Sequence, residues 1–162
     1  MKKIQMSEQL LVHKIQFLYD VETQIEKALP KMIKKATDEN LKAGLSTHLE
    51  ETTTQRERLE KIFELLDENP KKAKSETIRA LVLDSESALE LIDDPTLMDM
   101  AIAGSARQVE HYEMALYLCA ITDAEALGLD NVVQLLEETF QEEEATDEKL
   151  ADMTEEIVTT TE

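Results

Sequence analysis

Residues 103–121 read AGSARQVEHYEMALYLCAI, and this stretch decides the fold. Apolar residues recur in it at intervals of three and four, which is the spacing of an amphipathic helix. At about 100° per residue, Ala103, Tyr117 and Ile121 all lie within about 20° of Glu110 around that helix. The segment therefore predicts a helix whose buried face carries a glutamate.

The same spacing extends over almost all of the 162 residues and predicts an all-α protein. Three glycines and three prolines are too few for the frequent turns of an all-β domain. The predicted organisation of the single domain 1–162 is a helical hairpin at 7–67, a crossover helix at 75–92, a second hairpin at 95–157 and a frayed tail at 158–162. Two hairpins joined in this way form a four-helix bundle with a crossover helix between the second and third long helices.

Each of the four long helices places a glutamate on its predicted inner face: Glu22, Glu51, Glu110 and Glu143. Counted from hairpin turns near residues 38 and 128, the two glutamates of each hairpin lie within about 5 Å of the same level. A buried carboxylate is costly unless it is paired, protonated or bound to a metal ion. Four of them together predict a site for one or two divalent cations.

Further candidate ligands lie close to these glutamates along the chain. They are His48, Glu113 and Asp147, with Gln55 as a weaker candidate. The alternative is a network of charges without metal, in which His48 hydrogen-bonds to Glu51 on its own helix. We expect no Lys or Arg at the inner positions except Arg107 at their edge, and this favours the metal site.

Four motifs connect the chain with a known family. They are YDVE at 19–22, HLEET at 48–52, VEHYE at 109–113 and EEEATD at 142–147. Through them the chain resembles the YciE/YciF family of ferritin-like bacterial stress proteins over about residues 7–153. The resemblance implies a ferritin-like four-helix bundle with a metal centre, and it implies no particular reaction.

The expected ligand set differs from that of ferritin-like di-iron and di-manganese bundles, in which two helices each supply a Glu-x-x-His motif. Thr54 and Thr146 stand three residues after Glu51 and Glu143, where that motif has histidine. His48 is the one expected imidazole, so the site is rich in carboxylates. Oxygen ligands favour hard ions such as Mn(II), and an imidazole among them still admits Fe(II). We therefore expect Fe or Mn, as one ion or as a dinuclear centre.

The charge of the chain limits its partners. It carries 36 acidic and 17 basic residues, a net charge of −19. Such a surface repels phosphate backbones and anionic membranes, so we expect neither nucleic acid nor a membrane as a partner. No apolar run has the length of a signal peptide or a membrane span, and the one cysteine, Cys119, excludes an internal disulfide. These features predict a cytoplasmic protein.

Two functions fit the sequence. The first is a metal-binding stress protein whose centre handles oxygen or peroxide. The second is a metal-free helical scaffold that acts through dimerisation or partner binding, with Phe17, Leu49 and Phe63 as apolar contacts. A homo-oligomer, with a dimer favoured, is compatible with both. The residues assign no reaction, so the sequence does not decide whether the protein is an enzyme.

Overall fold

The computed structural model describes residues 3–159 and consists of five α-helices, with no β-strand in that range. They are α1 (Ser7–Lys35), α2 (Glu39–Leu65), α3 (Glu76–Leu89), α4 (Pro95–Ala126) and α5 (Asp130–Thr159). The all-α prediction is confirmed. Helix α5 extends two residues past its predicted end, so Val158 and Thr159 are helical, whereas residues 160–162 of the predicted tail lie outside the described residues.

Local chemistry explains where several helices begin and end. Asp38, Ser75 and Asp94 precede α2, α3 and α4, and each accepts a hydrogen bond from the backbone amide three residues ahead. Such caps satisfy amides that have no partner within the helix. Pro95 opens α4, where its missing N–H is not needed. Gly128 turns the chain from α4 into α5 with a φ of 66°, a conformation that favours glycine.

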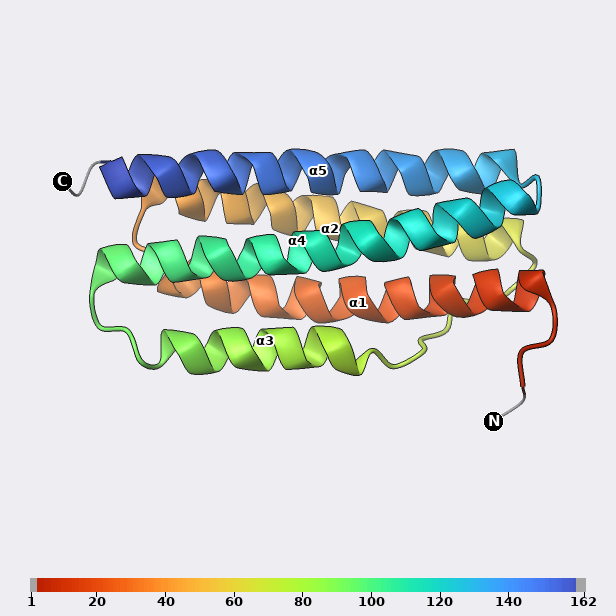
Figure 1. Ribbon diagram of the computed structural model, residues 1–162, viewed down its shortest axis with the longest axis horizontal. Helices are drawn as coiled ribbons and strands as arrows, with labels where there is room; N and C mark the ends of the chain where they lie inside the picture. Colours follow the sequence, from red (N-terminus) through yellow and green to blue (C-terminus); the bar gives the residue numbers. More distant parts are fainter. Residues whose placement is uncertain (1–2, 160–162) are drawn as a thin grey trace.

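The four long helices pack in a closed ring, in the order α1, α2, α5, α4 and back to α1. Figure 1 shows that α1 and α2 run in opposite directions, as do α4 and α5. Helices α2 and α4 run in the same direction, so the chain between them must return along the whole molecule. It does so through α3, which packs against α4 and α1 on one side of the ring. No helix within residues 3–159 combines the length and the apolar character that crossing a bilayer requires.

The interior divides into two apolar clusters with a polar layer between them. One cluster lies toward α3 and contains residues such as Leu29, Leu45 and Ile102. The other lies toward the opposite end and contains residues such as Leu11 and Leu59. Phe63 belongs to the second cluster and is fully buried, so its predicted role as an exposed contact is wrong. Along α2, α4 and α5, apolar core residues give way to polar ones at one level and then resume.

Candidate metal centre

The polar layer holds five of the seven predicted site residues. They are Glu22 on α1, His48 on α2, Glu110 and Glu113 on α4, and Glu143 on α5. Their exposed fractions lie between 0% and 3%. Each occupies a position on its helix where the apolar periodicity would place a core residue. The ring of four helices therefore brings five ionisable side chains to the same buried level.

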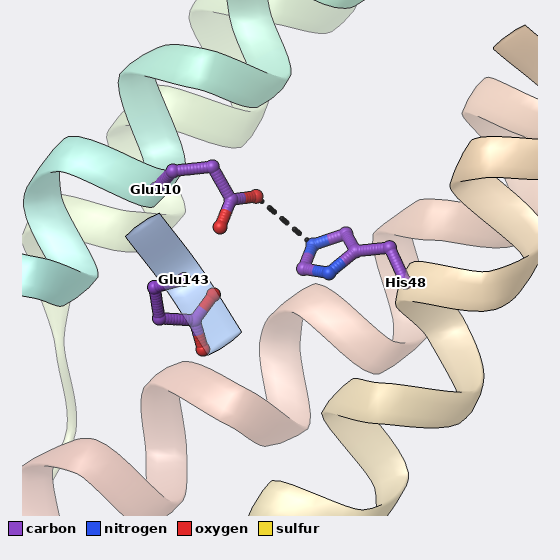
Figure 2. Close-up of side chains that lie close together, drawn as sticks. All are labelled: His48, Glu110 and Glu143. Carbon is purple, nitrogen blue, oxygen red and sulfur yellow. Dashed lines mark ion pairs between the residues drawn. The ribbon is translucent and has the colours of Figure 1, made fainter. Parts of the chain in front are cut away.

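Two groups of three ligand atoms lie close enough to hold a metal ion. His48, Glu110 and Glu143 form the first group, with one ligand atom each and all within 4.8 Å of one another. Figure 2 shows these three side chains pointing toward a common space from three different helices. The Nε2 atom of His48 lies 3.0 Å from Oε1 of Glu110.

Glu22, Glu113 and Glu143 form the second group under the same distance limit. Glu143 belongs to both groups, so one carboxylate with two oxygens stands between two adjacent trios. Carboxylates and an imidazole in this number suit Fe(II), Mn(II) and similar divalent ions. The donor set thus fits a metal ion in either position, and a pair of ions in both.

Most of the oxygens in this layer have no hydrogen-bond donor. Among the described residues, both carboxylate oxygens of Glu110, Glu113 and Glu143 are buried and form no hydrogen bond, although Oε1 of Glu110 lies 3.0 Å from Nε2 of His48. Oε2 of Glu22 and Nδ1 of His48 are also buried and form no hydrogen bond. Leaving a buried polar atom unpaired costs about 1–3 kcal/mol, and more for a charged group. So many unpaired acceptors in one place are a strong physical reason to expect a cation among them.

The electrostatics of the layer lead to the same conclusion. Burial raises the pKa of the Glu110 carboxyl to about 7, and the negative charge of Glu22 contributes to this shift. Burial also raises the pKa values of Glu22, Glu113 and Glu143 well above the ordinary range. The next largest cause for Glu22 and Glu113 is repulsion by the negative charge of Glu143. For Glu143 it is repulsion by the negative charge of Glu110. Without a cation, these groups must hold protons to remain buried. A divalent ion can take the place of those protons.

Glu51 and Asp147 lie outside both groups. Glu51 is half-buried and accepts a long hydrogen bond of 3.4 Å from the Thr146 hydroxyl. The carboxylate of Asp147 accepts hydrogen bonds of 2.8 and 3.3 Å from the guanidinium of Arg107. The metal-binding roles of both residues stay predictions, although Arg107 already neutralises Asp147.

Two further buried residues lie in the layer or beside it. The hydroxyl of Tyr117, fully buried, donates a hydrogen bond to Oε1 of Glu22 and so fixes that carboxylate. Arg58 is also buried, which contradicts the expectation that Arg107 alone approaches the inner positions. Arg58 stands seven residues after Glu51, so the angular arithmetic that selected the glutamates would also have found it.

Arg58 forms a separate charge network beside the layer. Its guanidinium binds the Glu142 carboxylate at 2.8 and 2.9 Å, and it also reaches Glu138 at 3.1 Å and the Thr139 hydroxyl at 2.7 Å. Glu142 also accepts a hydrogen bond of 3.1 Å from the Gln55 amide. Arg58 therefore forms ion pairs with Glu142 and Glu138 rather than with the neighbouring Glu143.

A cleft between α2 and α5 leads from the surface toward the layer. Its volume is about 250 Å³. Apolar groups form much of its wall, and it reaches two of the predicted ligands; its lining includes Gly44, Leu45, His48, Glu51, Leu150 and Met153. We call this cavity the α2/α5 cleft. It gives the otherwise buried His48 a connection to the outside.

These features define a class of protein: an all-helical domain with a buried cluster of carboxylates and one histidine between two apolar cores. Within that class the family is shown by sequence. The profile of the family described as "Domain of unknown function (DUF892)" matches residues 6–161, and the chain belongs to this family. The chain is 34% identical to Protein YciF of Escherichia coli (strain K12) over 147 residues, which are 90% of this chain and 89% of YciF.

Solved structures agree with this assignment. The structure of the E. coli stress protein YciF is similar with a TM-score of 0.92 and 32% identity, over 96% of this chain and 99% of that one. YcfI from Rhodopseudomonas palustris, described as "a putative structural protein", has a TM-score of 0.91 and 42% identity, over 93% and 96% of the two chains. A protein from Xanthomonas campestris pv. campestris, with a TM-score of 0.77 and 24% identity over 96% of each chain, shares the fold. The predicted resemblance to the YciE/YciF family is confirmed.

Proposed function

We propose that this protein is a ferritin-like four-helix bundle with α3 as its crossover helix, and that it binds one or two divalent ions, Fe or Mn, in the polar layer. One observation carries the proposal. Three glutamates at the centre of the bundle, Glu110, Glu113 and Glu143, are buried with neither carboxylate oxygen in a hydrogen bond, and Glu110 alone of the three is ion-paired among the described residues, with His48. Acidic clusters on a surface are common without metal, but buried and unpaired ones are costly.

The residues divide into distinct roles in this proposal. Glu143 would contribute to both positions, His48 and Glu110 to one, and Glu22 and Glu113 to the other. Tyr117 holds the Glu22 carboxylate in place through its hydroxyl. A bound pair of such ions supplies one-electron chemistry with oxygen or peroxide. The role of the chain is then to hold the ligands rigidly on helices and to keep bulk water out.

The similarity to YciF supports a role in the stress response, because that relative is described as a stress protein. A cytoplasmic location is part of the same proposal and rests on the sequence expectation alone. Removing or sequestering a reactive metal or oxidant would fit a protein of this kind.

Metal content per chain tests the proposal. The wild-type protein and Glu110→Ala are loaded anaerobically with Fe(II) or Mn(II), desalted and analysed for bound metal. We expect one or two retained ions per chain in the wild type and loss of at least one in the variant. Retention of no metal by the wild type would overturn the proposal, as would equal retention by both proteins.

A metal-free scaffold that acts through dimerisation is the second candidate, and two observations favour it. YcfI, 42% identical to this chain, is described as "a putative structural protein". Several large apolar side chains are exposed, among them Leu97 and Leu118 on α4. Sedimentation equilibrium of the wild type and of Leu118→Glu tests this candidate. A dimer that the substitution dissociates would support it, and a monomer in both cases would exclude it.

A further inference from the structure

The α2/α5 cleft approaches the polar layer from the side of His48. His48 is only 3% exposed, yet it lines the cleft together with the half-buried Glu51. An adjoining hollow of about 400 Å³ shares Gly44, Lys149 and Met153 with the cleft and continues outward along α2 and α5. The two spaces therefore form one passage between solvent and the layer.

The wall of this passage suits a small uncharged molecule better than an ion. Leu45, Leu150 and Met153 give the cleft apolar walls, which cannot replace the water around a cation. Lys149 lines both parts of the passage, and Asp152 and Glu156 line its outer part, so the charges at the mouth do not select against a cation, whereas the apolar inner walls do. A volume of about 250 Å³ is smaller than the pockets that hold drug-sized ligands. Apolar cavities of this kind do take up small apolar gases.

Gly44 and Met153 form a narrow point in the passage. A Cβ atom at position 44 would lie only 2.8 Å from Cε of Met153. Glycine is unfavourable relative to alanine in the interior of a helix, and here its lack of a side chain leaves room for Met153. The methionine side chain has three rotatable bonds, so it can move aside for a small molecule. A larger residue at position 44 would close the passage.

A second route to the layer is less open. A groove of about 260 Å³ lies between α1 and α3, and it adjoins a cavity that touches His48 and Glu110. That inner cavity has a volume of only about 20 Å³, room for about one water molecule. The groove and the inner cavity share Ala28, Met32, Val82 and Ser85, so a molecule entering there would pass these four side chains.

We propose that the α2/α5 cleft binds dioxygen and is the passage by which it reaches the His48 side of the polar layer, with Met153 over Gly44 as its narrow point. The proposal deepens the proposed function, because it names the small molecule that the metal centre would meet. It makes no use of a bound metal, so it can be tested on the metal-free chain.

Paramagnetic relaxation of methyl groups by dissolved dioxygen provides the test. Metal-free protein with labelled Leu and Met methyl groups is measured by NMR with and without oxygen pressure. Leu45 and Leu150 in the cleft are 0% and 3% exposed, and Leu11 and Leu18 in the other apolar cluster are 0% and 1% exposed, so the second pair is a matched control. We expect a relaxation enhancement about threefold larger in the cleft than in the control pair, because dioxygen collects in accessible apolar space. Equal enhancement in the two pairs would overturn the proposal.

Two variants complete the test. Gly44→Leu should reduce the enhancement at Leu45 and Leu150 to the level of the controls, and Met153→Ala should increase it. If Gly44→Leu does not fold, Met153→Ala alone decides, and no change in it contradicts the proposal. A dominant enhancement at Met32 would assign entry to the route between α1 and α3 instead. Metal retention is measured separately, so failure of the passage and failure of the metal centre are distinguishable.

Discussion

Asp99 and Glu110 lie on the same helix, eleven residues apart, and both are buried carboxylates, yet their surroundings differ completely. Asp99 accepts hydrogen bonds from the backbone amides of Thr37 and Asp38 at 2.7 and 2.9 Å, and from the Thr37 hydroxyl. It thereby fastens the turn between α1 and α2 to α4. Neither oxygen of Glu110 forms a hydrogen bond, and the imidazole of His48, with Nε2 3.0 Å from Oε1, is its charge partner.

The difference shows that burial alone does not mark a metal site. The chain satisfies a buried carboxylate when its role is structural, as it does for Asp99, and it also pairs the half-buried Glu142 with Arg58. It leaves Glu110, Glu113 and Glu143 unsatisfied together, in one layer. The feature that indicates a metal site is therefore the convergence of unpaired acceptors from several helices.

The largest expected effect is stabilisation by metal. At a free Mn(II) concentration about a thousandfold above the dissociation constant, we expect about 4 kcal/mol of added stability, because the ion binds only the folded chain. Thermal unfolding with and without Mn(II) measures this as a rise of about 10 °C in the midpoint. Asp99→Asn should keep the rise and Glu110→Gln should lose it. The same rise in all three proteins would mean that Mn(II) acts at the surface.

Substitution of Glu110 should change the pH dependence of stability in the metal-free protein. The folded-state pKa of about 7 lies above the ordinary value of 4.5, so the folded chain holds this proton more tightly than the unfolded chain. The contribution of this proton to the free energy of unfolding is fully present below the ordinary pKa and is lost as the pH rises through 7. Relative to wild type, Glu110→Gln should therefore gain about 3 kcal/mol between pH 5 and pH 8.

Urea unfolding of both proteins at a series of pH values between 5 and 8 provides this measurement. The difference between the two free energies of unfolding removes the contribution of every other titrating group that the substitution leaves unchanged. A difference that does not vary with pH would show that Glu110 is ionised in the metal-free fold.

Asp99→Ala should destabilise the protein without affecting metal. The substitution removes three accepted hydrogen bonds at a helix junction, which we expect to cost about 2 kcal/mol. The free energy of unfolding and the retained metal are measured on the same preparation. Loss of metal in a folded Asp99→Ala protein would remove the distinction between the two regions.

The smallest effect is expected at Asp147. Its carboxylate is paired with Arg107 near the surface, and pairs of this kind contribute about 0–1 kcal/mol. We expect Asp147→Asn to keep its metal and to lose less than about 1 kcal/mol of stability. Metal analysis and urea unfolding check both points. A loss of bound metal would place Asp147 among the ligands, as the sequence predicts.

Periodicity was sufficient for much of this structure. The five helices follow from apolar spacing and capping signals, and the inward glutamates follow from their angle relative to apolar neighbours on the same helix. These are properties of one helix at a time. Arg58 was within reach of the same arithmetic, because it stands two turns after Glu51 on the inner face.

Contacts between helices were harder to predict, because they depend on the relative rotation and level of two elements. The pairing of Asp147 with Arg107 joins α5 to α4, and that of Asp99 with Thr37 joins α4 to the turn after α1. On α2 the side chain that faces the interior is that of His48, whereas Glu51, which the sequence also places on the inner face, is half-buried. No pattern within a single helix records these choices.

Locating the metal directly is the most decisive measurement. The net charge of −19 provides many weak surface sites, so bound metal alone does not show where an ion lies. Crystals of the protein soaked with Mn(II) are examined for anomalous scattering. We expect one or two peaks between Glu110 and Glu143, at about 2.0–2.3 Å from carboxylate oxygens, with His48 beside one of them. Peaks confined to surface carboxylates, with the polar layer empty, would contradict this expectation.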